Sequence, residues 1–334
     1  MKRSMVNGIV RDGNSRASAI QPVFSSRLLG WYDAHARDLP WRKSRDPYRV
    51  WLSEIMLQQT RVAAVLEHYR IFLKRFPIVQ KLAAARESSV LAAWSGLGYY
   101  RRARMLHAAA KLVVKEHGGR FPETSEALRK LPGVGRYTAA AVASIAFAEP
   151  VAVVDGNVER VLSRFLGKQL DERSTWAAAE ELLDRKRPGD ANQAMMELGA
   201  TVCLPRDPQC LLCPVSEVCA TRADLPRTSK PAPQTKREIH FGLARRDGEV
   251  FLRQRSQTES LMPGMWELPA LSGMQPGKAL LSLRHSITVT DYRVRVLELA
   301  CPEEHGGAWI AGSRLMSLPL TGLARKILRK VEML

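Results

Sequence analysis

Long hydrophobic runs are missing from this 334-residue sequence. No stretch approaches the roughly 18 apolar residues that a membrane span needs, which rules out an integral membrane protein. The start, MKRSMVNGIVRDGNSR, also lacks a continuous apolar stretch and does not read as a secretory signal. Acidic residues are scarce, with 33 Asp and Glu against 51 Lys and Arg and a net charge of +18. This excess favours a polyanionic partner, either a nucleic acid or an acidic membrane surface.

The length predicts two domains, at roughly 150 residues per domain. Residues 1–22 show no periodicity, and we expect a flexible basic N-terminus there. Helical periodicity fills residues 23–225, whereas residues 226–238 are rich in proline and basic residues and are typical of a linker. From residue 239 to residue 334 the pattern changes to strands followed by a closing helix. The sequence therefore predicts a mainly α protein with a separate C-terminal α+β domain.

The clearest predicted helix covers residues 50–75 and carries polar side chains on its apolar face. At ~100° per residue, Glu54 and Gln58 fall within ~60° of the centre of the apolar stripe, near Tyr69, and Gln59 within about 80°. A glutamate on a core-facing stripe is costly unless it is paired or used, and burial raises its pKa. Such a carboxyl group suits a general acid at neutral pH. The alternative is a glutamate at the edge of the apolar stripe that is bonded to an arginine, which would give the same sequence pattern. Further helices are predicted over residues 88–94, 101–117, 124–130, 136–147, 157–166, 174–186, 190–202 and 319–332.

Four cysteines lie close together with the spacing C-x6-C-x2-C-x5-C: Cys203, Cys210, Cys213 and Cys219. An odd total of five cysteines argues against a disulfide scaffold, so a metal is the expected partner. A single CxxC with longer flanks suits four thiolates around an iron–sulfur cluster better than the paired CxxC knuckles of structural zinc. Structural zinc and buried thiols without a ligand remain the alternatives. Cys301 lies far away and reads as an ordinary thiol.

Two glycines, Gly133 and Gly135, precede an alanine-rich predicted helix in the segment LPGVGRYTA. Glycine can adopt backbone angles closed to other residues, and the peptide N–H groups of a helix N-terminus form an anion site. On a basic protein that anion would be a DNA phosphate; a plain connection between helices is the alternative. Asp155 follows an apolar run and starts the next helix, where it can act as an N-cap, as a catalytic carboxylate, or as both.

Several motifs in one order resemble the helix-hairpin-helix base-excision DNA glycosylases that carry an iron–sulfur cluster, with the MutY-type adenine glycosylases as the closer match. The resemblance is dense over residues 24–225. The motifs are RDLPWR (37–42), WLSEIMLQQT (51–60), WSGLGYYRRAR (94–104), LPGVGRYTA (131–139), VVDGNVERV (153–161) and MMELG (195–199), together with the cysteine spacing. The tail is more loosely similar to the family's Nudix-like recognition domain, through MPGMWELP (262–269) and LRHSITV (283–289).

The resemblance implies excision of adenine that is mispaired with 8-oxoguanine or guanine and has been flipped out of the helix. Glu54 would protonate the leaving adenine, and Asp155 would stabilise the positive charge on the sugar, as in glycoside hydrolysis. Asn157 and Tyr137 would orient these groups. Because bifunctional relatives carry a lysine at the position of Tyr137, which forms a Schiff base with the sugar, the resemblance implies a monofunctional enzyme that leaves an abasic site.

The same resemblance assigns the residues that hold the DNA. Arg42 and Glu197 would contact the flipped adenine, and Trp41 and Arg37 would line its pocket. The residues that would wedge into the base stack are Gln59 and Tyr99, with Gln58 and Leu97 beside them. Gly133 and Gly135 would bind phosphate.

In the tail, the loop that inspects 8-oxoguanine in the family often reads Phe-Ser-His. Here the aligned residues are Ile287, Thr288 and Val289. Thr288 keeps a hydroxyl group, whereas Val289 offers no hydrogen bond. His285, just before the loop, is the candidate substitute for the missing histidine.

The resemblance further implies one 4Fe-4S cluster held by the four cysteines. It implies double-stranded DNA as the partner, no membrane, a monomer, and a cytoplasmic location at the bacterial nucleoid. Two other functions stay open. One is a glycosylase for another mismatched base, such as thymine opposite guanine. The other is an inactive iron–sulfur protein that binds DNA or senses redox state.

Overall fold

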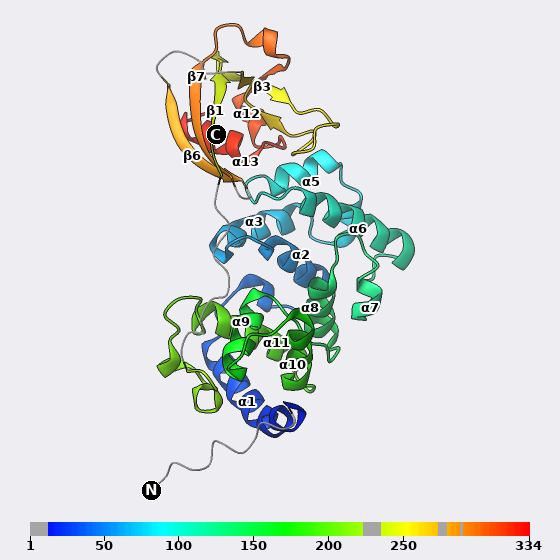
Figure 1. The fold of residues 1–334 in the computed structure, drawn as a ribbon. Coiled ribbons are helices and arrows are strands. Elements are labelled where there is room, and N and C mark those ends of the chain that lie inside the picture. The colour runs from blue at the N-terminus through cyan, green and yellow to red at the C-terminus, as the bar shows by residue number, and fades with distance from the viewer. Residues whose placement is uncertain (1–12, 223–234, 273–278, 288–289) are drawn as a thin grey trace. The chain divides into compact units, whose positions relative to one another are not determined.

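The computed structural model describes residues 13–222, 235–272, 279–287 and 290–334, with side chains from Ile20 onward (Figure 1). The chain divides into two compact units that are not consecutive in sequence. Unit 1 comprises Met1–Gln58 and Glu116–Thr228, and unit 2 comprises Gln59–Lys115 and Ser229–Leu334. By its contacts, the helical segment 59–115 groups with the C-terminal segment.

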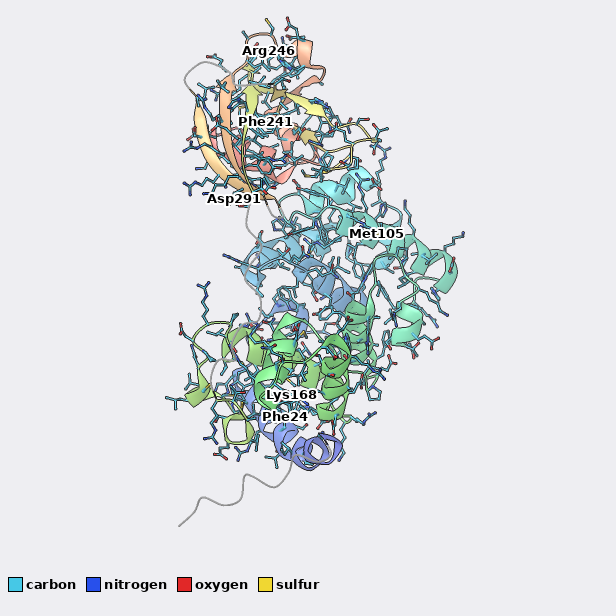
Figure 2. The ribbon with its side chains drawn as sticks, in the orientation of Figure 1. Phe24, Met105, Lys168, Phe241, Arg246 and Asp291 are labelled. Carbon is cyan, nitrogen blue, oxygen red and sulfur yellow. The ribbon has the colours of Figure 1, made fainter. Side chains whose placement is uncertain are left out.

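Unit 1 is helical in its described part. Its helices are α1 (Gly13–His35), α2 (Pro47–Leu57), α7 (Ser125–Leu128), α8 (Arg136–Phe147), α9 (Gly156–Leu166), α10 (Glu172–Leu182) and α11 (Pro188–Thr201), with 3-10 turns η1 (Pro40–Arg42), η2 (Cys210–Leu212) and η3 (Ser216–Val218). Helix α11 packs against α1, α8 and α9. Phe24, Leu162 and Leu198 are fully buried in this core, and Figure 2 shows Phe24 on α1.

We expected a flexible N-terminus over residues 1–22, and this was wrong from Gly13 onward, because α1 begins there. Residues 1–12 lie outside the described ranges. Ile20, Phe24 and Leu28 recur at helical spacing and pack on the core of unit 1, which gives this segment a reason to be helical. Among the described residues, no helix combines the length and the apolar character that crossing a membrane requires.

The helix predicted over residues 50–75 is interrupted. Helix α2 ends at Leu57 and α3 (Val62–Arg75) begins four positions after Gln58. Between them Gln59 has a left-handed backbone with φ 54°, which stops a right-handed helix. The apolar period continues on both sides of the break, so the sequence pattern concealed it. The other predicted helices are present, with three differences in their bounds. The helix predicted over 174–186 ends at Leu182, and the one predicted over 124–130 is a single turn. The helix predicted over 319–332 is the shorter α13 (Gly322–Lys330).

Unit 2 combines helices and strands. Its helices are α3, α4 (Val79–Ala83), α5 (Glu87–Trp94), α6 (Arg101–His117, whose last two residues belong to unit 1), the turn η4 (Pro302–His305), α12 (Gly312–Leu315) and α13. Its strands are β1 (Thr235–Leu243), β2 (Arg245–Arg246), β3 (Glu249–Gln254), β4 (Trp266–Glu267), β5 (Ala270–Leu271), β6 (Leu281–Ile287), β7 (Thr290–Glu298) and β8 (Ala308–Ala311).

The strands form two sheets around one core. The first sheet has the order β5-β1-β7-β6, with β1 and β7 parallel from Thr235↔Thr290 to Leu243↔Glu298. The second joins β2, β3 and β4, and β8 also pairs with β3. Phe241, labelled in Figure 2, packs with the inward side chains of β7 and with α13. The predicted C-terminal α+β domain is thus confirmed, and its first strand begins at Thr235, inside the segment expected to be a linker.

Buried hydrogen bonds join the helical and sheet parts of unit 2. The backbone carbonyl of Leu320 accepts from Ser95 Oγ at 2.7 Å and from the Tyr100 hydroxyl at 3.1 Å. Arg325 Nε on α13 donates to Ser95 Oγ at 3.1 Å. Because all four residues are buried, the turn between α5 and α6 is fixed against the C-terminal domain.

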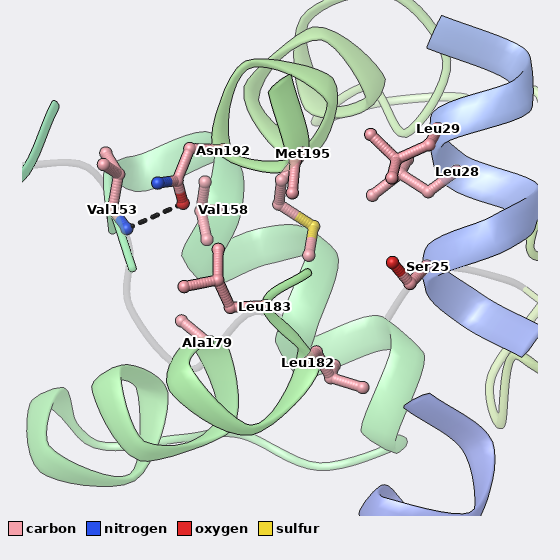
Figure 3. Close-up of a pocket in the computed structure, with 11 residues that line it drawn as sticks. Ser25, Leu28, Leu29, Val153, Val158, Ala179, Leu182, Leu183, Asn192 and Met195 are labelled. Atoms are coloured by element: carbon pink, nitrogen blue, oxygen red, sulfur yellow. Dashed lines mark hydrogen bonds between the residues drawn. The ribbon is translucent and has the colours of Figure 1, made fainter. Parts of the chain in front are cut away.

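Unit 1 also contains a small cavity among α1, α9, α10 and α11, with room for about one water molecule (Figure 3). Its lining is mainly apolar, and Asn192 beside it accepts a hydrogen bond from the backbone N–H of Val153 at 3.0 Å. None of the predicted catalytic side chains lines this cavity. It is too small for a nucleobase and belongs to the packing of the core.

Candidate active site

Glu54 occupies the middle of α2 and is only 6% exposed. Helix α2 packs against α8, and the hydroxyl group of Tyr137, in the first turn of α8, donates to Glu54 Oε2 at 2.7 Å. The glutamate is therefore inside unit 1, as its place on the apolar face indicated. Its hydrogen-bond partner is a neutral phenol and not the arginine that a rim position would have offered.

Burial raises the pKa of Glu54 to about 7. The hydrogen bond from Tyr137 and the charge of Arg42 oppose this shift, whereas the negative charge of Asp155 adds to it. Burial, together with Glu54 and Asp155, raises the pKa of Tyr137 well above its ordinary value. At neutral pH Glu54 can thus carry a proton and give it away, while Tyr137 remains a protonated phenol.

Asp155 is the N-cap of α9, and three donors fix its carboxylate. Oδ1 accepts from the backbone N–H groups of Asn157 at 2.9 Å and Val158 at 2.8 Å. Oδ2 accepts from the side-chain amide of Asn157 at 3.0 Å. Capping and orientation are therefore both observed, and the cap places a negative charge at the positive end of a helix.

Arg160 and Gly199, which the sequence analysis did not single out, hold Asn157 in place. Arg160 donates from Nη2 to Asn157 Oδ1 at 2.8 Å and to the Gly199 carbonyl at 2.7 Å, and from Nε to the Cys203 carbonyl at 2.9 Å. A Cβ atom on Gly199 would lie 2.6 Å from Cβ of Asn157, so only glycine allows this approach. Both residues stand in quoted motifs, but their partners are mainly backbone atoms that no sequence pattern reveals.

Glu197 lies on α11 with its side chain fully buried between two arginines. Arg37 donates to Oε1 from its backbone N–H at 3.1 Å and from Nε at 2.6 Å, and to Oε2 from Nη2 at 2.7 Å. Arg42 donates to Oε2 at 2.7 Å. Burial alone would raise the pKa of Glu197, but the bonds from Arg37 and Arg42 lower it to about 2. Trp41, between the two arginines in sequence, is buried.

The residues predicted to enter the base stack differ in exposure. Gln59 and Tyr99 are exposed, whereas Leu97 is 6% exposed and packs inside unit 2. Gln58 is half-buried in unit 1 and donates to Thr138 Oγ1 on α8 at 3.1 Å.

The glycine hairpin lies between α7 and α8. Gly133 has φ 73°, a left-handed conformation that favours glycine, and Gly135 is the N-cap of α8. Both glycines are exposed, as a phosphate-binding turn requires.

The loop predicted to inspect 8-oxoguanine starts at Ile287, the last residue of β6. His285 is half-buried on this strand opposite Tyr292 of β7. Burial, followed by the charge of Lys326, lowers the pKa of His285, so the ring is neutral at physiological pH. Thr288 and Val289 lie outside the described residues.

The four clustered cysteines line one cavity together with Arg164. Arg164 Nη1 donates to Cys203 Sγ at 3.3 Å, and no disulfide joins any of the five cysteines, all of which are described. A single zinc ion would need every sulfur at roughly 2.3 Å from one point. Within the described ranges, no group of three or more His, Cys, Asp or Glu side chains is placed to hold a metal ion. Four thiols lining one cavity are a donor set of the kind that an iron–sulfur cluster takes.

The chain is similar in sequence and in fold to known proteins. The family described as "HhH-GPD superfamily base excision DNA repair protein" matches residues 52–186. Adenine DNA glycosylase of Homo sapiens is 50% identical over 215 residues, which are 60% of this chain and 39% of that protein. Adenine DNA glycosylase of Buchnera aphidicola subsp. Schizaphis graminum is 35% identical over 242 residues, 70% of this chain and 69% of that protein. The chain spans less than half the length of the human relative.

Solved structures share the helical fold. A thermostable thymine-DNA glycosylase superposes with a TM-score of 0.58 at 33% identity, over 61% of this chain and 97% of that one. An endonuclease III trapped on DNA as a covalent intermediate gives a TM-score of 0.54 at 23% identity, over 62% and 96%. At that identity the second likeness concerns the fold alone.

Because Glu54 is buried, we expect the stability difference between the parent and the variant Glu54→Gln to depend on pH. Because the pKa of Glu54 rises from 4.5 in the unfolded chain to about 7 in the folded one, ionisation costs stability as the pH increases through this window. Glu54→Gln should therefore be more stable than the parent by about 3 kcal/mol near pH 8 and by only about 1 kcal/mol near pH 5, measured by urea unfolding. The control is Glu159→Gln, an exposed glutamate on α9. Equal unfolding free energies for Glu54→Gln and the parent near pH 8 would contradict the raised pKa.

Proposed function

The chain belongs to the adenine DNA glycosylase family, and we propose that it hydrolyses the N-glycosidic bond of adenine mispaired with 8-oxoguanine or guanine in double-stranded DNA. The observation that carries this proposal is the pair of carboxyl groups in unit 1. Glu54 is buried with a pKa of about 7, and Asp155 is held by three hydrogen-bond donors close enough to influence that pKa. A proton donor and a fixed negative charge are the two groups that glycosidic hydrolysis requires.

In the proposed reaction Glu54 donates its proton to a nitrogen of the imidazole ring of the flipped adenine. The bond between the sugar C1′ and the base breaks, and the electron pair leaves with the adenine. Asp155 stabilises the positive charge that develops on the sugar. Water then adds to C1′ and loses a proton, so the products are free adenine and an abasic site.

We infer that the enzyme is monofunctional. Strand cleavage in bifunctional relatives uses a lysine amine that forms a Schiff base with the sugar. At the matching hairpin position this chain has Tyr137, whose pKa is raised and whose hydroxyl group is bonded to Glu54. A phenol cannot form a Schiff base, so the chain should leave the DNA backbone intact.

The adenine pocket is proposed to use Arg37, Trp41, Arg42 and Glu197. Glu197 already accepts four hydrogen bonds, two on each oxygen, which is the full capacity of a carboxylate. We therefore assign it the role of fixing Arg37 and Arg42, and the direct contact with the base falls to Arg42, with Trp41 beside it.

The C-terminal domain is proposed to be Nudix-like and to read the base opposite the adenine. Thr288 supplies a hydroxyl group and His285 a neutral ring, in place of the histidine that the family loop carries. Deleting the whole domain would also remove the carbonyl that binds Ser95 and Tyr100, so a deletion would change more than recognition. The substitution His285→Ala separates the two effects.

The cysteine cavity is proposed to hold one 4Fe-4S cluster through Cys203, Cys210, Cys213 and Cys219. The four thiols line one space, and Arg164 supplies a nearby positive charge that suits thiolate ligands. When bound, the cluster would supply a structural centre for the loop that follows α11.

Two alternatives have their own support. A thymine glycosylase is favoured by the 33% identity to the thermostable thymine-DNA glycosylase. An inactive iron–sulfur protein that binds DNA would keep the positive charge of +18 and the cysteine cavity but would not need a protonated Glu54. We further propose that the chain acts as a monomer on chromosomal DNA.

A strand-nicking assay tests the proposed function. Duplexes that carry adenine opposite 8-oxoguanine, adenine opposite guanine, or thymine opposite guanine are incubated with the protein and divided into samples with and without alkali. We expect nicking of the adenine strand only after alkali, and a loss of at least about a hundredfold for Glu54→Gln with binding retained. Nicks without alkali would contradict the monofunctional assignment. Release of thymine and not adenine would favour the first alternative, and no release from any duplex the second.

Metal analysis tests the cofactor. The purified protein should contain about four iron atoms per chain and show the broad visible absorption of a thiolate-bound cluster. Cys210→Ser should lose most of the iron, whereas Cys301→Ser should keep it, because Cys301 is exposed in unit 2. One zinc per chain with no iron would overturn the assignment.

A further inference from the structure

Two turns of unit 2 share an unusual backbone conformation. Gln59, between α2 and α3, has φ 54°, and Tyr99, just before α6, has φ 49°. Side chains other than glycine rarely adopt this left-handed region, and residues held there concentrate at functional sites. Both side chains are also exposed, and both are among the residues proposed to enter the base stack.

One side chain, Arg102, contacts both turns. Its Nη2 donates to Thr60 Oγ1 at 3.1 Å, in the first turn, and to the carbonyls of Gly98 at 3.2 Å and Leu97 at 3.4 Å, in the second. Its guanidinium group lies 5.3 Å from the centre of the Tyr99 ring. A single nitrogen thus bonds the residue after Gln59 and the two residues before Tyr99.

The surroundings of Arg102 favour a fixed position. The side chain is half-buried and also lies 5.5 Å from the ring of Trp94, which is fully buried. Burial lowers the pKa of Arg102 to about 10, so the group is still charged at neutral pH and donates strong hydrogen bonds. A planar guanidinium group can satisfy several acceptors at once, which a lysine cannot do in the same way.

The two ends of the second turn are fixed separately. Ser95 and Tyr100 both donate to the Leu320 carbonyl of the C-terminal domain. These contacts hold the start and the end of the turn, and Arg102 acts on its middle, where Gly98 and Tyr99 have positive φ.

We propose that Arg102 is a positioning residue that sets the spacing of Gln59 and Tyr99, so that both side chains enter the base stack together. The proposal rests on the proposed function and extends it to a residue that does not itself need to touch the flipped base. The physical basis of this role is preorganisation. The protein bears the conformational cost of the two left-handed residues when it folds, so the side chains of Gln59 and Tyr99 need no further ordering when they unstack the DNA bases.

The test measures base unstacking in a protein that cannot complete the reaction. In a Glu54→Gln background, the protein is mixed with a duplex that carries adenine opposite 8-oxoguanine and the fluorescent base 2-aminopurine next to the adenine. Unstacking raises the fluorescence. We expect Arg102→Met to slow this rise by at least about tenfold, because a charge-assisted contact shared by two turns is lost. Arg101→Met, at the exposed neighbouring position on α6, should match the parent.

Thr60→Val supplies a milder variant that removes only the hydroxyl acceptor of the first turn. It should slow the rise by about threefold with an unchanged melting temperature. The proposal is overturned if Arg102→Met folds and unstacks the DNA at the parent rate. If Arg102→Met does not fold, the proposal is overturned when Thr60→Val unstacks the DNA at the parent rate. Adenine release by the unmodified protein distinguishes a failure of this proposal from a failure of the proposed function. If the proposed function is wrong, the unmodified protein releases no adenine.

Discussion

The burial of one carboxyl group, Glu54 on α2, is the constraint on which the rest of the site depends. Removing an ionisable group from water costs free energy, and the molecule reduces that cost by keeping the group protonated up to about pH 7. The packing of α2 on α8 produces this burial and brings Tyr137 to the carboxyl group. The same energetic cost that weakens the fold at high pH makes the group a proton donor at neutral pH.

The two buried glutamates of unit 1 show how the environment sets their roles. Glu54 is bonded to a neutral phenol and has a pKa of about 7, whereas Glu197 is bonded to two arginines and has a pKa of about 2. The first can exchange a proton at neutral pH and the second stays ionised, which agrees with the different roles proposed for the two groups. Asp155 takes a third role, since its bonds to α9 and Asn157 fix the direction of its charge.

The sequence predicted the burial of Glu54 and the helix cap at Asp155 better than it predicted the path of the chain. Glu54 could be recognised as buried because apolar spacing is visible in sequence, and Asp155 because helix caps have a residue signature. The break at Gln59 could not be seen, since a left-handed residue leaves the apolar period intact on both sides. Arg160 and Gly199 escaped because their partners are largely backbone atoms of distant segments. The grouping of segment 59–115 with the tail depends on contacts such as Ser95 with Leu320, which are far apart in sequence.

The central claim is that a protonated Glu54 starts the reaction, and the most direct test is the pH dependence of adenine release in a single turnover. The rate on a duplex with adenine opposite 8-oxoguanine is measured from about pH 5.5 to about pH 9. If Glu54 is the acid, the rate should be highest at low pH and should fall about tenfold per pH unit above a midpoint near 7, the pKa of the buried group. A rate that stays constant or increases up to about pH 9 would contradict the account.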